Sequence, residues 1–248
     1  MRQKLAAGNW KMNGTSELLS EIQELVTVAP FSQTDVLICP PATLLERVSN
    51  IVNGNFSTGG QDCHMDENGA HTGDISGEML RDAGASYVIV GHSERRQDHH
   101  ESDLIVRQKA SAAISAELIS IICLGENLEQ REAGNALAII SEQLANSVPE
   151  TATGENVVIA YEPVWAIGTG KVATLDQIEE AHTFIRNQLA ERFGTLPANA
   201  FRILYGGSVK ASNAIEIFSV PNVDGALVGG ASLRASDFIP IIDALERV

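Results

Sequence analysis

Several polar side chains suited to acid–base chemistry follow directly after short apolar runs of the chain. In chain order they are Asn9, Lys11, His92, Glu94, Glu126 and Glu162. A carboxylate can accept a proton, an imidazole can donate one, and an ammonium group stabilises negative charge that develops during a reaction. The set therefore indicates proton transfer on a substrate that becomes more negative as it reacts.

Each of these residues also has an ordinary structural explanation when it is taken alone. His92 can be a hydrogen-bonded histidine beside a strand, Glu162 a capping carboxylate ahead of Pro163, and Lys11 a surface charge. Ionisable groups in such places are often structural. A common site becomes the better interpretation only if the fold brings all of them to one place.

Two glycine-rich turns follow further apolar runs and could hold an anion. Gly206-Gly207-Ser208 comes after residues 201–205, and Gly229-Gly230 comes after residues 225–228. Backbone N–H groups at such turns and at helix N-termini bind phosphate. They would supply local positive potential in a chain whose formal net charge is −15.

A third glycine-rich stretch covers residues 168–171 (GTGK). It is not a Walker loop, because Trp165 and Val172 stand where that pattern requires Gly and Ser or Thr. Its match to a dinucleotide-binding pattern is weak for two reasons. The stretch begins well after the apolar run that ends at Tyr161, and no second strand ending in an acidic residue follows about twenty residues later. Glycines flanking a mobile lid are the better interpretation.

The elements that must position these groups alternate regularly along the chain. The apolar runs are residues 5–8, 36–39, 57–61, 87–90, 119–124, 157–161, 201–205 and 225–228. Segments with helical periodicity lie between them, at residues 16–29, 43–52, 102–116, 129–147, 174–192, 213–218 and 235–247. Most runs are apolar at consecutive positions, as in strands covered on both faces.

This alternation predicts an α/β protein with one (β/α)₈ barrel domain over residues 1–248. An open doubly wound sheet is the structural alternative. In a barrel, groups that follow the carboxyl ends of the strands share one rim, so all the polar residues above would meet there. Residues 62–79 break the pattern, since they are long, polar and Gly-rich with only a short helix possible near residues 78–83.

Composition and charge exclude several classes of function. A net charge of −15 disfavours nucleic-acid and acidic-membrane partners, which require basic patches. The three cysteines, Cys39, Cys63 and Cys123, form no CxxC pair, so we expect no disulfide framework and no metal site. The apolar residues 5–8 are too few for a signal-peptide core, and no stretch reaches membrane-spanning length. We therefore expect a soluble, cytoplasmic protein.

Five sequence blocks are similar, in order, to those of the triosephosphate isomerase family. They are residues 9–13 (NWKMN), 91–96 (GHSERR), 160–171 (AYEPVWAIGTGK), 205–209 (YGGSV) and 224–231 (DGALVGGA). The resemblance runs from about residue 5 to the last helical segment. It implies a TIM barrel and an isomerase that interconverts dihydroxyacetone phosphate and D-glyceraldehyde 3-phosphate by enediol-mediated proton transfer, in glycolysis and gluconeogenesis, without a cofactor.

Two other functions are weighed against this one. Another sugar-phosphate barrel enzyme would need catalytic groups other than Glu162 and His92, and the chain offers no clear metal cluster or Schiff-base lysine. A non-catalytic phosphate-binding barrel would have lost the base or the imidazole, and both are present.

The resemblance implies a role for each polar residue of the rim. Glu162 would be the base that moves a proton between C1 and C2, and His92 would donate to the substrate oxygens as a neutral imidazole. Lys11 would stabilise the enediolate and the phosphate, with Asn9 adding a hydrogen bond. Glu94 is similar to a supporting carboxylate near Lys11. We expect desolvation to raise the basicity of Glu162 and a helix starting at residue 93 to disfavour the imidazolium form of His92.

The resemblance also implies a phosphate site, a lid and a dimer. Backbone N–H groups of Gly168, Ser208, Gly229 and Gly230 would hold the phosphate. Residues 163–173 would form the active-site lid, and the residues that close or anchor it would be Ile167, Leu227, Trp165 with Glu126, and Tyr205.

Residues 62–79 would be a dimerisation loop that docks into a second copy and brings Thr72 close to the partner's site. His71 stands where the family commonly has an aromatic residue, Gly77 replaces a frequent proline, and Asp98 replaces another aromatic. These departures concern packing and dimer stability. His71 would enter the partner's pocket, either without an acidic partner or with a carboxylate beside its ring.

Overall fold

The computed structural model describes residues 2–168 and 171–248 of the chain. Within these residues, eight parallel strands close into a barrel in chain order, with the last strand pairing with the first. The strands are β1 (Lys4–Asn9), β2 (Thr34–Cys39), β3 (Ser57–Gly60), β4 (Tyr87–Val90), β5 (Ile119–Leu124), β6 (Val157–Tyr161), β7 (Arg202–Tyr205) and β8 (Gly225–Val228). The closed order confirms the barrel and rules out an open sheet.

Most of the strands, though not β3, are apolar at consecutive positions because both of their faces are buried. In β6, Val158 and Ala160 belong to the cluster inside the barrel. Val157, Ile159 and Tyr161 belong to the larger cluster between the barrel and the surrounding helices. Alternate residues of one strand therefore fill two cores, which is why no polar alternation marks these runs in the sequence.

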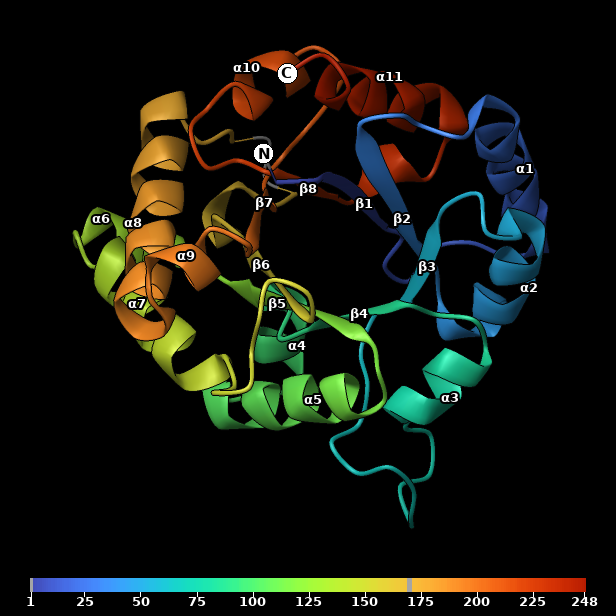
Figure 1. Ribbon diagram of the computed structural model, residues 1–248, viewed down its shortest axis with the longest axis horizontal. Helices are drawn as coiled ribbons and strands as arrows, with labels where there is room; N and C mark the ends of the chain where they lie inside the picture. The colour runs from blue at the N-terminus through green and yellow to red at the C-terminus, as the bar shows by residue number, and fades with distance from the viewer. Residues whose placement is uncertain (1, 169–170) are drawn as a thin grey trace.

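Helices form the outer ring around the barrel (Figure 1). In chain order they are η1 (Ser16–Leu18), α1 (Leu19–Val28), α2 (Ala42–Val52), α3 (Gly77–Asp82), α4 (Ser93–Asp98), α5 (Asp103–Ser115), α6 (Leu128–Glu132), α7 (Ala136–Ser147), η2 (Val164–Ala166), α8 (Leu175–Phe193), α9 (Thr195–Ala198), α10 (Ala214–Phe218), η3 (Gly230–Ser232) and α11 (Ala235–Leu245). No helix in the described part of the chain is both long and apolar enough to cross a membrane.

Local signals account for several helix boundaries. Ser102 caps α5 with its side chain, and Thr174 forms a capping box with Gln177 at the start of α8. The expected single helix at residues 129–147 is wrong, because it is divided into α6 and α7. Gly134 adopts a left-handed φ of 73° between them, a conformation that ends a helix.

The segment between β3 and α3 projects beyond the ring of helices (Figure 1). We call residues 62–76 the projecting segment. Its end is fixed by Ser76, whose hydroxyl accepts a hydrogen bond from the N–H of Met79 and so caps α3. The last residues of the expected loop, 77–79, consequently belong to this helix.

Candidate active site

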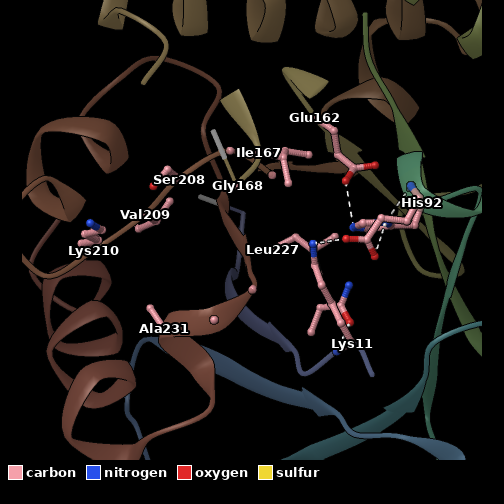
Figure 2. Close-up of a pocket in the computed structure, with 16 residues that line it drawn as sticks. Lys11, His92, Glu162, Ile167, Gly168, Ser208, Val209, Lys210, Leu227 and Ala231 are labelled. Atoms are coloured by element: carbon pink, nitrogen blue, oxygen red, sulfur yellow. Dashed lines mark hydrogen bonds and ion pairs between the residues drawn. The ribbon is translucent and has the colours of Figure 1, made fainter. Parts of the chain in front are cut away.

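A cavity of about 380 Å³ opens at the rim formed by the carboxyl ends of the strands. The residues that line it are Asn9, Lys11, His92, Glu94, Glu162, Ile167, Gly168, Gly206, Gly207, Ser208, Val209, Lys210, Leu227, Gly229, Gly230 and Ala231. In Figure 2, Glu162, His92 and Lys11 lie on one side of this cavity, and Ser208, Val209 and Lys210 lie on the other. The fold thus brings the predicted acid–base groups and the predicted anion-binding turns to one place.

Glu162 follows β6 and is buried, with only 1% of its surface exposed. Its Oε1 lies 2.9 Å from Nε2 of His92, and its Oε2 accepts a hydrogen bond of 2.9 Å from the backbone N–H of Ser93. The hydroxyl of Ser93 also donates to Oε1. Both carboxylate oxygens are therefore engaged by the turn that joins β4 to α4.

His92 sits at the start of α4, immediately after Gly91. Gly91 has a φ of 65°, a left-handed conformation that turns the chain from β4 into the helix. The backbone N–H of Glu94 donates to Nδ1 of His92 over 3.2 Å. Because Nδ1 accepts this hydrogen bond, the proton of a neutral ring lies on Nε2, which faces Glu162.

The pKa values of Glu162 and His92 are shifted in opposite directions. Burial raises the pKa of Glu162, but the charge and hydrogen bonds of His92 and the hydrogen bonds of Ser93 outweigh burial and lower it. Burial lowers the pKa of His92, and Glu162 outweighs that effect and raises it. The expectation that desolvation makes Glu162 more basic is thus wrong for this conformation, because donors compensate the buried charge.

The same finding bears on the expectation of a neutral His92. The hydrogen bond from Glu94 favours the neutral ring, but the pKa of His92 is raised and not lowered. The main cause is the neighbouring carboxylate, so this influence would end if Glu162 moved away from the ring.

Lys11 follows β1 in a left-handed conformation, with φ of 53°. Two contacts hold this turn: the N–H of Lys11 donates to Oδ1 of Asn9, and Gln61 Nε2 donates to the carbonyl of Lys11. The Lys11 ammonium group lies 2.5 Å from Oε1 of Glu94. Such a backbone conformation in a non-glycine residue often accompanies function, and here it directs a cation into the cavity.

Glu126 and Trp165 meet as the family resemblance implies. The indole Nε1 of Trp165 donates to Oε1 of Glu126 over 2.8 Å, and the Tyr161 hydroxyl donates to the same oxygen. Glu126 is fully buried, and burial raises its pKa despite these donors. The beginning of the expected lid is consequently fixed to the barrel beneath it. Residues 169 and 170 of the expected lid lie outside the described residues.

Tyr205 lies at the end of β7 with a buried hydroxyl. Burial raises its pKa to about 12, while the backbone N–H of Ala173 approaches closely enough to lower it somewhat. No hydrogen bond of good geometry to this hydroxyl is present among the described residues. A Cβ on Gly207 would lie 2.2 Å from the hydroxyl oxygen, so only glycine fits beside it. Tyr205 thus faces the end of the expected lid.

The expected phosphate-binding residues Gly168, Ser208, Gly229 and Gly230 all line the cavity. Gly229 and Gly230 form the turn between β8 and α11, where Ser232 closes the turn through hydrogen bonds to the carbonyl of Gly229. Ser208 lies in the turn after β7, which is held by Asn213. A Cβ on Gly230 would meet open space. The backbone at Gly230 is therefore accessible to a ligand.

Sequence reasoning missed some contributors to the site. Ser93 binds both oxygens of Glu162, although it was considered only as the start of a helix. Lys210 lines the cavity, and its position two residues after Ser208 is the signal that could have revealed it. The predicted dimer residues His71 and Thr72 do not line this cavity; both are exposed on the projecting segment.

A second hollow of about 570 Å³ adjoins the cavity and shares Asn9, Lys11, His92 and Glu94 with it. Its other lining residues are Met12, Asn13, Gln61, Asp62, Arg95, Asp98 and His99. Met12 is 96% exposed, an unusual position for a large apolar side chain. Asn9, Lys11, His92 and Glu94 thus border a second opening as well.

Comparisons with known proteins agree with this geometry. A family model described as triosephosphate isomerase matches residues 4–245. The triosephosphate isomerase of Ruegeria pomeroyi is 60% identical over 248 residues, covering 100% of this chain and 99% of the relative. That of Dinoroseobacter shibae is 58% identical over 246 residues, covering 99% and 100%. A crystal structure of triosephosphate isomerase from Bartonella henselae is 50% identical, with a TM-score of 0.92 and 98% of each chain covered.

Proposed function

The chain belongs to the triosephosphate isomerase family, and we propose that it interconverts dihydroxyacetone phosphate and D-glyceraldehyde 3-phosphate at the rim cavity. The main support is the convergence of a carboxylate, an imidazole and an ammonium group opposite glycine-rich turns. The isomerisation moves hydrogen between two carbons without net oxidation, so these groups suffice and no cofactor is required.

Glu162 is the proposed base. Its carboxylate removes a proton from C1 of dihydroxyacetone phosphate, which leaves an enediolate, and the resulting carboxylic acid returns a proton at C2. Both of its oxygens are occupied by Ser93 and His92 in this conformation. Glu162 must therefore leave these donors to reach the substrate, and its basicity rises as it loses them.

His92 and Lys11 are the proposed stabilisers of the enediolate. Nε2 of His92 faces Glu162 and both residues line the cavity, so this nitrogen can donate to a substrate oxygen once the carboxylate has moved. Lys11 supplies positive charge, and the hydrogen bond from its own N–H fixes Oδ1 of Asn9, which leaves the amide N–H₂ as a donor. Glu94 positions the Lys11 ammonium group. Donors placed before the reaction begins stabilise such an oxyanion well.

The phosphate is proposed to lie against the backbone of Gly168, Ser208, Gly229 and Gly230. These residues and Lys210 all line the cavity. Backbone N–H groups and one cation can balance a dianion locally even in a chain of net charge −15.

Residues 163–173 are proposed as the lid that closes over the bound substrate. Ile167 and Leu227 line the cavity, so closure would place two apolar side chains over Glu162 and exclude water. At the start of the lid, Trp165 donates a hydrogen bond to Glu126 of the barrel. At its end, the backbone N–H of Ala173 approaches the hydroxyl of Tyr205. An enediolate shielded from water is less exposed to side reactions.

A second copy of the chain is the proposed partner of the projecting segment. Thr72 is exposed, lines neither hollow of its own chain, and would complete the neighbouring site by entering the partner's second hollow. Isologous docking of this kind gives a homodimer with two equivalent sites. Asp66 lies 3.0 Å from His71, which favours the alternative in which a carboxylate accompanies this ring into the interface.

The remaining expectations concern location and partners. We propose a cytoplasmic location and a role in glycolysis and gluconeogenesis, because triose phosphates are intermediates of both. The net charge of −15 supports the expectation that neither nucleic acid nor an acidic membrane is a partner.

The assignment of Glu162 is tested by Glu162→Gln, which keeps the side-chain volume and removes the proton acceptor. We expect kcat to fall by roughly three orders of magnitude or more, while inorganic phosphate binds with nearly unchanged affinity. Incorporation of solvent deuterium at C1 of dihydroxyacetone phosphate should stop as well. If the purified Gln variant keeps a tenth of the wild-type kcat, Glu162 is not the base.

A further inference from the structure

Lys210 is a cation at the edge of the rim cavity whose ammonium group has no fixed partner in the described part of the chain. Lys4, Lys11 and Lys109, by contrast, each bind a carbonyl or a carboxylate. Lys210 is exposed, and no carboxylate within residues 2–168 and 171–248 lies at ion-pair distance from its ammonium group. A lysine that makes no such contact within its own fold is available to a ligand.

The backbone beneath this side chain is held on both sides. The N–H of Lys210 donates to Oδ1 of Asn213 over 2.8 Å, and the carbonyl of Lys210 accepts hydrogen bonds from the N–H groups of Asn213 and Ala214. Nδ2 of Asn213 donates to the carbonyl of Ser208, so one amide side chain joins Lys210 to the expected phosphate-binding turn. The preceding residue, Val209, is buried. The fold thus fixes the backbone of Lys210 and leaves its side chain free to move.

Lys210 also lies where two hollows meet. It lines the rim cavity together with Ser208 and Gly230, and it lines a neighbouring hollow of about 480 Å³ that shares Gly230. Figure 2 shows Lys210 beside Ser208, across the cavity from Glu162. A flexible lysine side chain at this place can meet an anion that approaches the glycine-rich turns from solvent.

The charges that line the rim cavity show why a second cation matters there. Glu94 and Glu162 contribute two carboxylates, and Lys11 and Lys210 contribute two ammonium groups. With a neutral His92 these charges cancel, whereas the described lining without Lys210 would carry a net negative charge. The ammonium group of Lys11 is also engaged by Glu94. In a chain of net charge −15, Lys210 is therefore well placed to offset the repulsion of an incoming dianion.

We propose that Lys210 binds the phosphate of the substrate through its ammonium group, from the solvent side of the turns at Ser208, Gly229 and Gly230. The ion pair adds a full charge that backbone donors lack, so it raises the rate of capture of a phosphate dianion and the affinity for it. Lys210 contacts the phosphate only and takes no part in proton transfer. The identity of the substrate rests on the proposed function, whereas binding of inorganic phosphate tests Lys210 separately.

The simpler explanation is a solvated surface lysine, or one that stabilises the fold through Asp237 in the neighbouring hollow. A series of substitutions separates these explanations. Lys210→Gln removes the charge, Lys210→Arg keeps it, and Lys210→Glu reverses it. Arg247→Gln is the matched control, because it also removes one positive charge, and Arg247 is an exposed residue after α11 that lines neither the rim cavity nor the neighbouring hollow.

Inorganic phosphate is the first probe, measured by titration calorimetry on the full-length chain at low ionic strength. We expect Lys210→Gln to weaken phosphate binding roughly threefold or more, Lys210→Glu to weaken it further, and Lys210→Arg to retain most of it. Added KCl should reduce the affinity less in Lys210→Gln than in the wild type, because one ion pair fewer is screened. Arg247→Gln should bind phosphate as the wild type does. All variants should unfold at the urea concentration that unfolds the wild type.

Turnover gives a second readout. The kcat/KM for dihydroxyacetone phosphate should fall in Lys210→Gln by about the same factor as phosphate binding, with a smaller change in kcat. The slow isomerisation of D-glyceraldehyde, which has no phosphate, should be equal in this variant and the wild type, because Glu162, His92 and Lys11 are unchanged. A wild type that isomerises neither substrate would contradict the proposed function, and the phosphate titration would still decide the role of Lys210.

Three results would overturn the proposal. The first is a phosphate affinity in Lys210→Gln that matches that of Arg247→Gln. The second is an equal loss of activity toward D-glyceraldehyde, which would show damage to the site and not the loss of a phosphate contact. The third is Lys210→Arg as weak in phosphate binding as Lys210→Gln, which would show that the charge of the side chain is not what matters.

Discussion

His182 is a fully buried histidine that lies outside the catalytic cavity. Its Nδ1 lies 3.1 Å from the carbonyl oxygen of Asn222, and its ring packs edge-on against Tyr161. Burial lowers its pKa from 6.5 to about 4, although Asn222 and Asp224 act in the other direction. The folded protein therefore holds this ring neutral in a pH range where the unfolded chain binds a proton.

This difference predicts a loss of stability in mild acid. Below pH 6.5 the unfolded state gains a proton that the folded state does not take up until about pH 4, so the free energy of unfolding falls through that window. The shift corresponds to roughly 2 kcal/mol lost at pH 5 from this residue. His182→Asn keeps a donor for Asn222 but does not titrate, so urea unfolding should show a smaller difference between pH 7 and pH 5 in the variant.

His92 also titrates, so the pH dependence of the free energy of unfolding must be compared between the variant and the wild type, and not only between two pH values of one protein. His100→Asn is an exposed control that should keep the wild-type dependence. Equal pH dependence in His182→Asn and the wild type would show that the buried ring does not contribute.

Residue types and spacing predicted most of the site, because strand ends in a parallel barrel converge on one rim. Glu162, His92, Lys11 and Asn9 all line the cavity as expected. The pairing of Glu162 with Ser93 was not predictable, because the order of residues does not determine which way a side chain turns in a ligand-free site. The contacts of the Glu162 carboxylate with Ser93 and His92 also explain why its pKa is lowered, whereas the sequence predicts a raised value.

At the scale of elements, burial explains both what was predictable and what was not. Most strands were recognisable because their alternate residues fill two cores, as in β6, whereas β3 (Ser57–Gly60) contributes no residue to either core and fits only by its place in the alternation. The break between α6 and α7 was hidden, because Gly134 interrupts an otherwise helical pattern and a single glycine inside a helix is tolerated. The start of α3 at Gly77 depends on the cap by Ser76, a signal that a polar Gly-rich segment obscures.

Removal of lid residues should change the products more than the fold. Of the residues 167–170, Ile167 is half-buried and Gly168 is exposed, so their deletion takes little from the core. The contact between Trp165 and Glu126 lies outside the deletion. We expect a folded enzyme with low kcat that releases methylglyoxal and phosphate as a several-fold larger share of turnover. Without the lid residues, water can reach the enediolate and the enediolate is free to rotate about its bonds.

The product ratio is measured by trapping methylglyoxal during conversion of glyceraldehyde 3-phosphate. Leu196→Ala is the control, because this side chain is 86% exposed, lies outside the proposed lid and should leave the ratio unchanged. A deletion variant with the wild-type ratio would show that the lid does not protect the intermediate.

At the scale of the whole molecule, the rim that carries the proposed catalytic residues is open on the side of the second hollow. Lys11, His92 and Glu94 line both cavities, so solvent reaches them through the second one unless something covers it. The projecting segment extends beyond the ring of helices and contributes neither Thr72 nor His71 to the cavities of its own chain (Figure 1). Docking of the segment from a second copy would account for both features.

This arrangement predicts complementation between two inactive chains. The first carries Glu162→Gln, and the second has residues 65–74 replaced by a Gly/Ser linker of the same length. The second chain should fold, because its barrel core does not use these residues, but sediment as a monomer with little activity. Mixed at micromolar concentrations, the two should form a heterodimer in which the intact segment of the first completes the intact Glu162 site of the second. Activity should therefore rise well above the sum of the separate chains.

Thr72→Val, which keeps the shape of the side chain and loses its hydroxyl, should remain dimeric with lowered kcat. A linker chain that stays dimeric or fully active alone would contradict the docking model, and so would a mixture that exchanges subunits without gaining activity.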